Sequence, residues 1–141
     1  MRIRAALLAF LGAWLVLPAV SFASVVAKID ISEQRMYVYV DGSRYATWRV
    51  STGAGRYRTP TGSFRPTVLR RMHYSSKYDG AAMPHSVFFH RGYAIHGTDQ
   101  LRYLGRRASH GCVRLHPRNA ARLFSLVSRH GASRTRIVVS H

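Results

Sequence analysis

The sequence predicts a mainly β domain with one substantial helix, an α+β fold, and three observations support this prediction. Short runs of aromatic and β-branched residues recur along the chain, and glycine, proline or Asp-Gly pairs separate them. Only one stretch, near the C-terminus, repeats its apolar residues at helical spacing. The length of 141 residues suffices for a single domain.

The first 23 residues have the features of a secretory signal peptide. Arg2 and Arg4 precede an apolar run, residues 5–17, that is too short to span a bilayer comfortably. The small-x-small sequence Ser21-Phe22-Ala23 predicts cleavage after its last residue, and an uncleaved N-terminal anchor is the alternative.

This reading divides the chain into a signal peptide, residues 1–23, and a domain, residues 24–141. We expect the domain to be exported to the periplasm or cell wall and to keep no stable membrane span after cleavage.

Strand signals dominate the expected domain. Asp41-Gly42 predicts a hairpin turn, because both central positions of a type I′ turn need a positive φ. Pro66 places the strand that contains it at an edge or a bulge. Strands are expected at residues 25–31, 36–40, 45–51, 64–69, 86–89, 93–96 and 136–140.

The remaining segments are a long loop, one helical turn and one helix. Residues 70–83 are polar and irregular, which predicts a loop that either covers a binding pocket or is a plain surface excursion. Residues 99–104 fit one helical turn. The helix should begin at Pro117 and end before Gly131. Its predicted buried face comprises Ala120, Leu123, Phe124 and Val127.

The charge is strongly basic, with 22 Lys and Arg against 5 Asp and Glu and a formal net charge of +17. These basic residues are dispersed, and no long Lys/Arg tract or aromatic-basic motif typical of nucleic-acid binding occurs. We therefore expect no nucleic-acid partner. For an exported protein, the charge indicates anionic surroundings such as wall carboxylates.

The chain contains a single cysteine, Cys112, so no intramolecular disulfide can form. A free thiol in an oxidising compartment is a liability unless it is buried or has a chemical role. With one cysteine, few acids and no His-x-x-x-His pair, a zinc site is not expected, and neither a metal nor a cofactor is predicted.

His96 and Gly97 precede this cysteine in a pattern that suits nucleophilic catalysis. A thiol needs a base to take its proton, and an imidazole can serve. A third group must fix the tautomer of that imidazole, and the Gly97 carbonyl is close enough in sequence to do so. Gly111 allows a tight turn before Cys112 in which backbone amides can converge on an oxyanion. From the residues alone, a chance pairing of histidine and cysteine stays open.

Two motifs resemble the signature of the L,D-transpeptidases, the YkuD-type catalytic domain of bacterial wall enzymes. They are "YAIHGT", residues 93–98, and "SHGCVRL", residues 109–115. Supporting similarity lies in "VSTGAG", "TPTGSF" and "NAARLF", and it extends over residues 25–140. The resemblance implies a β-sandwich catalytic domain.

The resemblance also implies a role for each matching residue. Cys112 matches the nucleophile, His96 the general base and Gly97 the third member, which acts through its carbonyl. Ser109, His110 and Gly111 match the loop that supports the oxyanion. Arg114 and Tyr93 are expected to bind substrate, although some relatives carry asparagine at the position of Arg114.

The implied substrate is a tetrapeptide stem of peptidoglycan. Attack by Cys112 would release D-alanine and leave a thioester, and an amine from a neighbouring stem would then form a 3→3 cross-link. Water as acceptor would make the enzyme an L,D-carboxypeptidase, and a lysine of an envelope protein would make it an anchoring enzyme. Other readings are a different exported Cys-His amidase or endopeptidase, a non-catalytic basic wall-binding module and a basic polyanion-binding protein.

Overall fold

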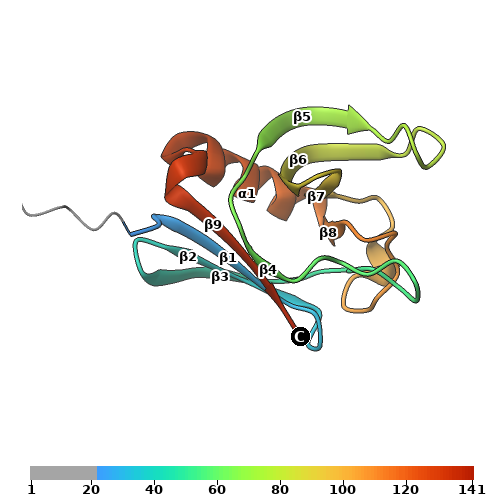
Figure 1. Cartoon of the computed structure of the whole chain (residues 1–141), viewed down its shortest axis with the longest axis horizontal. Helices are drawn as coiled ribbons and strands as arrows, with labels where there is room; N and C mark the ends of the chain where they lie inside the picture. The colour runs from blue at the N-terminus through green and yellow to red at the C-terminus, as the bar shows by residue number, and fades with distance from the viewer. Residues whose placement is uncertain (1–21) are drawn as a thin grey trace, which may run out of the picture.

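The computed structural model describes residues 22–141 (Figure 1). The predicted signal peptide lies outside this part of the chain, apart from its last two residues. Within residues 22–141, the strands are accompanied by one α-helix, α1 (Pro117–His130), and two 3₁₀ turns, η1 (Leu101–Tyr103) and η2 (Ala132–Arg134). The strands are β1 (Val25–Asp30), β2 (Arg35–Val40), β3 (Ser43–Arg49), β4 (Gly62–Phe64), β5 (Val68–Tyr74), β6 (Ala82–His90), β7 (Tyr93–Gly97), β8 (Val113–Leu115) and β9 (Thr135–Ser140).

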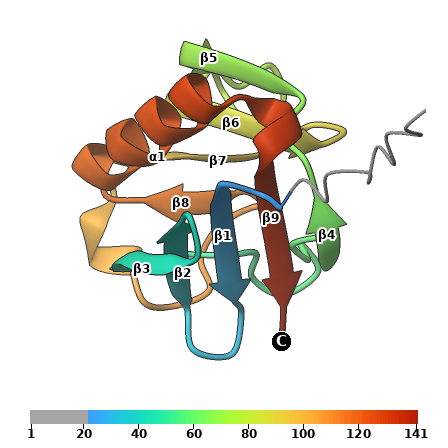
Figure 2. The ribbon, with the colours of Figure 1, turned by 90° about the vertical axis from the view of Figure 1, so that its left-hand side faces the viewer.

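The strands form two sheets, which confirms the predicted mainly β fold (Figure 2). The first has the order β3-β2-β1-β9-β4. In it β9, the strand at the C-terminus, pairs in parallel with β1. The second has the order β5-β6-β7-β8, and its β7-β8 pair is also parallel. This last pairing brings the segment around residue 96 beside the segment around residue 114.

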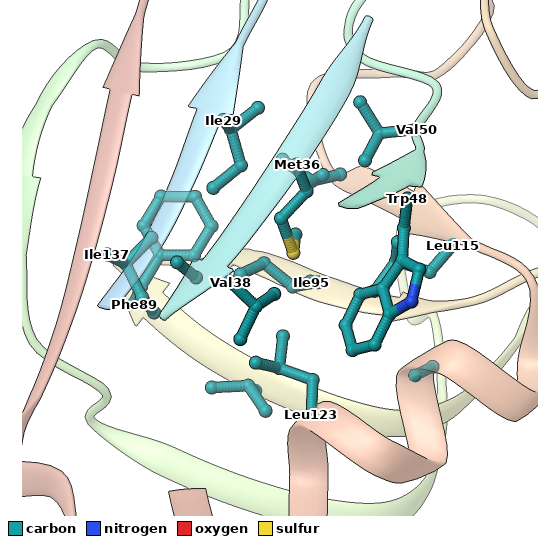
Figure 3. Close-up of a cluster of buried hydrophobic side chains, with 14 of the residues drawn as sticks. Ile29, Met36, Val38, Trp48, Val50, Phe89, Ile95, Leu115, Leu123 and Ile137 are labelled. Carbon is teal, nitrogen blue, oxygen red and sulfur yellow. The ribbon is translucent and has the colours of Figure 1, made fainter. Parts of the chain in front are cut away.

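The core lies between the two sheets and α1 (Figure 3). Strict alternation buries every second residue of β1, and Met36 and Val38 of β2 are buried in the same way. Ile95 of β7 and Leu123 of α1 meet them from the other side of the core. Because a strand presents alternate residues to one face, this pattern fixes which side of the first sheet faces the core.

The helix agrees with the prediction at both ends. Pro117 occupies its first turn, and the His116 side chain accepts a hydrogen bond from the Arg118 amide at 3.2 Å. Gly131 follows the helix with φ of 88°. Leu126 joins the predicted buried residues, whereas Phe124 is only partly buried and packs edge-on against His85.

The hairpin turn and the single helical turn are confirmed. Asp41 and Gly42 have φ of 48° and 83°, as a type I′ turn requires. The expected turn within residues 99–104 is η1.

Two expectations about residues 64–83 are wrong. The strand expected at residues 64–69 is divided, because the chain leaves β4 before Pro66 and starts β5 after it. Residues 70–83 are not an irregular loop: β5 and β6 extend into them, and only residues 75–81 form the connection. Most β5 side chains are exposed, so the alternation that marks a half-buried strand is missing from its sequence.

Candidate active site

The parallel pairing of β7 with β8 places the predicted residues around one cavity. His96 of β7 lies opposite Arg114 of β8 in the register, and Cys112 directly precedes β8. All three line a cavity with a volume of about 760 Å³, together with Ser109 and His110. His96 and Cys112, which lie 16 positions apart in sequence, thus line the same cavity.

His96 is buried, with 7% of its surface exposed. Its Nδ1 lies 2.7 Å from the Gly97 carbonyl oxygen. A carbonyl oxygen only accepts hydrogen bonds, so Nδ1 carries the proton and donates, and Nε2 is left unprotonated. Burial lowers the pKa of His96 to about 4, which keeps the ring neutral at physiological pH.

Cys112 is a free, partly buried thiol. The Ala94 amide donates a hydrogen bond to its Sγ at 3.4 Å. Burial raises the pKa of the Cys112 thiol, while the Ala94 hydrogen bond and the nearby Arg114 charge act in the opposite direction. The pair therefore rests as neutral thiol and neutral imidazole, and the thiol must lose its proton as it reacts.

The turn before Cys112 is held by the buried Ser109 side chain. Ser109 Oγ donates to the Cys112 carbonyl at 2.6 Å and accepts from the Gly111 amide at 3.0 Å. Gly111 has φ of 116°, and an added Cβ would lie 2.6 Å from the Tyr93 ring. Glycine is required here, both for its backbone conformation and to make room for Tyr93.

Arg114 is half-buried, and burial lowers its pKa, although a guanidinium keeps its charge at any physiological pH. Its Nη1 donates a hydrogen bond to the Gln100 side-chain oxygen at 3.4 Å. An arginine held loosely at the wall of a cavity can receive an incoming carboxylate through two parallel hydrogen bonds.

The sequence motifs do not indicate the roles of several polar residues behind the turn that precedes Cys112. Thr59 is buried; its Oγ1 accepts from the Gly53 amide at 2.9 Å and donates to the Gly111 carbonyl at 2.8 Å. Thr52 accepts from the Gln34 side chain at 2.6 Å, and its carbonyl accepts from the Ser109 amide at 3.0 Å. The "VSTGAG" and "TPTGSF" segments therefore hold the turn that carries Cys112.

Replacing Thr59 by valine is expected to lower both stability and activity. Valine keeps the shape of the side chain but leaves the Gly53 amide and the Gly111 carbonyl without their buried partner, at a cost of about 1–3 kcal/mol. Chemical denaturation would measure the stability, and the rate of Cys112 modification by a small alkylating agent would report on the turn. Thr61→Val is the control, because Thr61 is exposed. Equal stability of the two variants would contradict the role of Thr59.

An aromatic cluster lines the same cavity as Cys112. The His110 ring stacks on Tyr78 at 4.2 Å between centroids and meets the Tyr57 ring edge-on at 4.7 Å. Tyr78 comes from the connection between β5 and β6, and Tyr57 from the loop after β3. His110 is thus an exposed residue whose ring packs against tyrosines from two other segments.

A second cavity, of about 550 Å³, lies beside this cluster. It is lined by Tyr93 and Arg56 and shares Cys112, Tyr57, Tyr78 and His110 with the first cavity. The thiol therefore borders two spaces, and the aromatic cluster forms part of the wall of both.

Among residues 22–141, no group of three or more His, Cys, Asp or Glu side chains is placed to hold a metal ion. In the same part of the chain, no helix has the length and apolar character needed to cross a bilayer.

Comparison with known families gives one match that covers most of the chain. Residues 24–139 match the model of the YkuD family, described as the L,D-transpeptidase catalytic domain. No curated protein matches the chain.

Solved structures of L,D-transpeptidases have the same fold. An L,D-transpeptidase from Mycobacterium smegmatis is 25% identical, with a TM-score of 0.75, and the match covers 84% of this chain and 59% of that one. For the enzyme from Stackebrandtia nassauensis the values are 27%, 0.73, 84% and 56%. For the enzyme from Xylanimonas cellulosilytica they are 28%, 0.72, 85% and 62%. The chain thus spans about three fifths of the structures that it matches.

Proposed function

Since the chain belongs to the YkuD family of L,D-transpeptidase catalytic domains, we propose that it transfers the acyl group of a peptidoglycan tetrapeptide stem through a thioester on Cys112. The observation that carries this proposal is the placement of Cys112 and His96 on one cavity, with the His96 tautomer set by the Gly97 carbonyl. The substrate lies outside the cytoplasm, so the proposal includes export of the domain to the periplasm or cell wall.

The first half-reaction forms the acyl-enzyme. As Cys112 Sγ attacks the carbonyl on the L-centre of the diamino acid at the third stem position, its proton passes to Nε2 of His96. The tetrahedral intermediate collapses, the bond to D-alanine breaks, and the imidazolium returns the proton to the departing amine. The Gly97 carbonyl holds the ring throughout and stabilises the imidazolium.

The turn before Cys112 supplies the oxyanion site in this proposal. The Gly111 amide is bound to Ser109 Oγ, so the amides of His110 and Cys112 are the donors that we assign to the oxyanion. Ser109 and Gly111 act by holding this turn in shape. Because the amides are fixed before the reaction, they need no reorganisation as charge develops.

Arg114 and Tyr93 are assigned to the substrate. Arg114 would pair with a carboxylate of the donor stem in the larger cavity, and Tyr93 would contact the substrate in the smaller one. Because Cys112 lines both cavities, we assign the donor stem to the one that contains Arg114 and the amine acceptor to the other. This amine would come from a neighbouring stem or from a lysine of an envelope protein.

The proposal is tested by intact-mass spectrometry of the protein mixed with purified disaccharide-tetrapeptide. We expect a covalent adduct equal to the stem minus D-alanine on the wild type and none on Cys112→Ala. Dimeric products would identify transpeptidation, and tripeptide alone would identify the carboxypeptidase. A folded protein with a free thiol that forms neither adduct nor product would contradict the proposal and favour a non-catalytic wall-binding module.

A further inference from the structure

The first sheet has an outer side that faces away from α1 (Figure 1). Burial alternates along β1 and β2, so the residues between the core positions point outward. We call this surface the basic face. It comprises Lys28, Arg35, Tyr37, Tyr39, Arg44 and Arg136.

The strand register places these residues in adjacent rows. Tyr39 is paired with Arg44 on one side and with Val26 on the other, and Val26 is paired with Arg136. In the next row Lys28 is paired with Tyr37. Arg44 and Arg136 are separated by three strand spacings, or about 14 Å. A polymer with repeated negative charges can contact cations spread over this width of the sheet at the same time.

The two tyrosine rings hold the cations in place. The Arg44 guanidinium lies 4.8 Å from the Tyr37 ring centre and 5.1 Å from that of Tyr39, and it donates to the Tyr39 hydroxyl at 2.8 Å. Lys28 Nζ lies 5.2 Å from the Tyr39 ring centre. A cation that already rests on a ring loses less side-chain freedom when it binds an anion.

Acidic groups lie at the ends of this face. Asp30 and Glu33 belong to the end where β1 turns into β2, and Glu33 accepts a hydrogen bond from the Tyr37 hydroxyl. Asp41 belongs to the turn at the other end and borders a surface groove of about 880 Å³ that also involves Arg134 and Arg136. The central rows therefore keep an excess of positive charge.

We propose that the basic face binds the anionic network of peptidoglycan at carboxylates outside the stem being cleaved. The identity of the polymer rests on the proposed function, whereas the polyanion-binding character rests on the cations themselves. None of the residues that line the two cavities around Cys112 belongs to β1, β2, β3 or β9. The wall can therefore occupy the basic face while a stem occupies the active site.

An anionic membrane is the less suitable partner. Of the large exposed hydrophobic side chains of residues 22–141, Val68, Met72, Tyr74 and Leu101 lie outside the first sheet. Tyr45 belongs to β3, and Phe22 precedes β1 in the segment that the expected cleavage removes. The face can attract lipid head groups through charge but offers little apolar surface for insertion.

The test compares two variants that lose the same charge. The first combines Lys28→Gln, Arg44→Gln and Arg136→Gln on the basic face. The control combines Arg118→Gln, Arg122→Gln and Arg129→Gln, which are exposed on α1. Each is assayed at low salt for co-sedimentation with purified sacculi and with phosphatidylglycerol vesicles. Acylation of Cys112 by the soluble disaccharide-tetrapeptide is measured separately. Thermal melting confirms that both variants fold.

We expect the face variant to bind sacculi about tenfold more weakly, the control less than about twofold, and both to keep wild-type acylation. Equal losses in the two variants would show that net charge alone matters, and unchanged binding by the face variant would also overturn the proposal. A face variant that loses binding only to phosphatidylglycerol vesicles would assign the face to membranes instead. Absent acylation in all proteins would refute the proposed function, while the sacculus binding would still decide the role of the face.

Discussion

Replacing His96 by glutamine is expected to slow acylation of Cys112 by about a thousandfold near neutral pH, within the usual contribution of a general base. Glutamine has a side chain of similar size whose amide can still donate a hydrogen bond, but it cannot accept the thiol proton. The neutral state of both groups makes this proton transfer part of the attack: burial keeps the His96 pKa near 4 and raises the pKa of the Cys112 thiol. The quantity to measure is the second-order rate constant of adduct formation.

The pH dependence separates this role from a structural one. The wild-type rate needs neutral His96, so its acid limb should lie near pH 4 and not near the ordinary histidine value of 6.5. The glutamine variant can react only through thiolate, so its rate should rise about tenfold per pH unit below the raised thiol pKa. The ratio of the wild-type acylation rate to that of the glutamine variant should therefore decrease as pH rises.

A matched control is His130→Gln, at the end of α1. This variant should keep the wild-type rate and acid limb. A glutamine variant at residue 96 whose rate is lowered equally at every pH would show that His96 only shapes the site. A wild-type acid limb near pH 6.5 would show that the ring is solvated during the reaction.

The part of the fold that follows from local sequence was predictable. β1, β2 and α1 each bury one face, so their apolar periodicity is visible in the sequence. β5 is an edge strand whose side chains are mostly exposed. Its two arginines and its histidine give the segment a polar composition, which favours a loop over a strand in a sequence-based prediction. β8 has only three residues, too few for a pattern, and its position depends on pairing with β7.

In the site, too, residues that lie close together in sequence were predictable and those brought together by the fold were not. The Cys112 and His96 motifs lie within one short stretch, so their spacing carries the information. The role of Thr59 depends on a hydrogen bond to Gly111, which lies 52 residues further along the chain. The "TPTGSF" segment resembles the family in sequence, but only the fold shows that its Thr59 supports the turn before Cys112. The aromatic cluster of Tyr57, Tyr78 and His110 likewise joins three segments that are separate in sequence.

Replacing Gly53 by alanine is expected to be the most damaging small substitution in the scaffold of the site. An added Cβ would lie 1.6 Å from the Tyr57 carbonyl oxygen, which is far inside van der Waals contact and involves backbone that cannot rotate away. The loop after β3 would have to move, and a loss of about 3 kcal/mol or more in the free energy of unfolding is expected. That is a large fraction of the stability of a domain of this size.

Movement of the loop after β3 should also displace the turn before Cys112. Gly53 donates its amide to Thr59, Thr59 holds the Gly111 carbonyl, and the next residue, Ala54, donates its amide to the Ser109 carbonyl at 3.0 Å. Gly92→Ala is the matched control for stability, because a Cβ there would meet nothing within 4 Å. Denaturation of the two variants should differ by at least about 2 kcal/mol. If Gly53→Ala were as stable as Gly92→Ala, the loop would be able to yield, and the tight contact between Gly53 and Tyr57 would not be what positions Cys112.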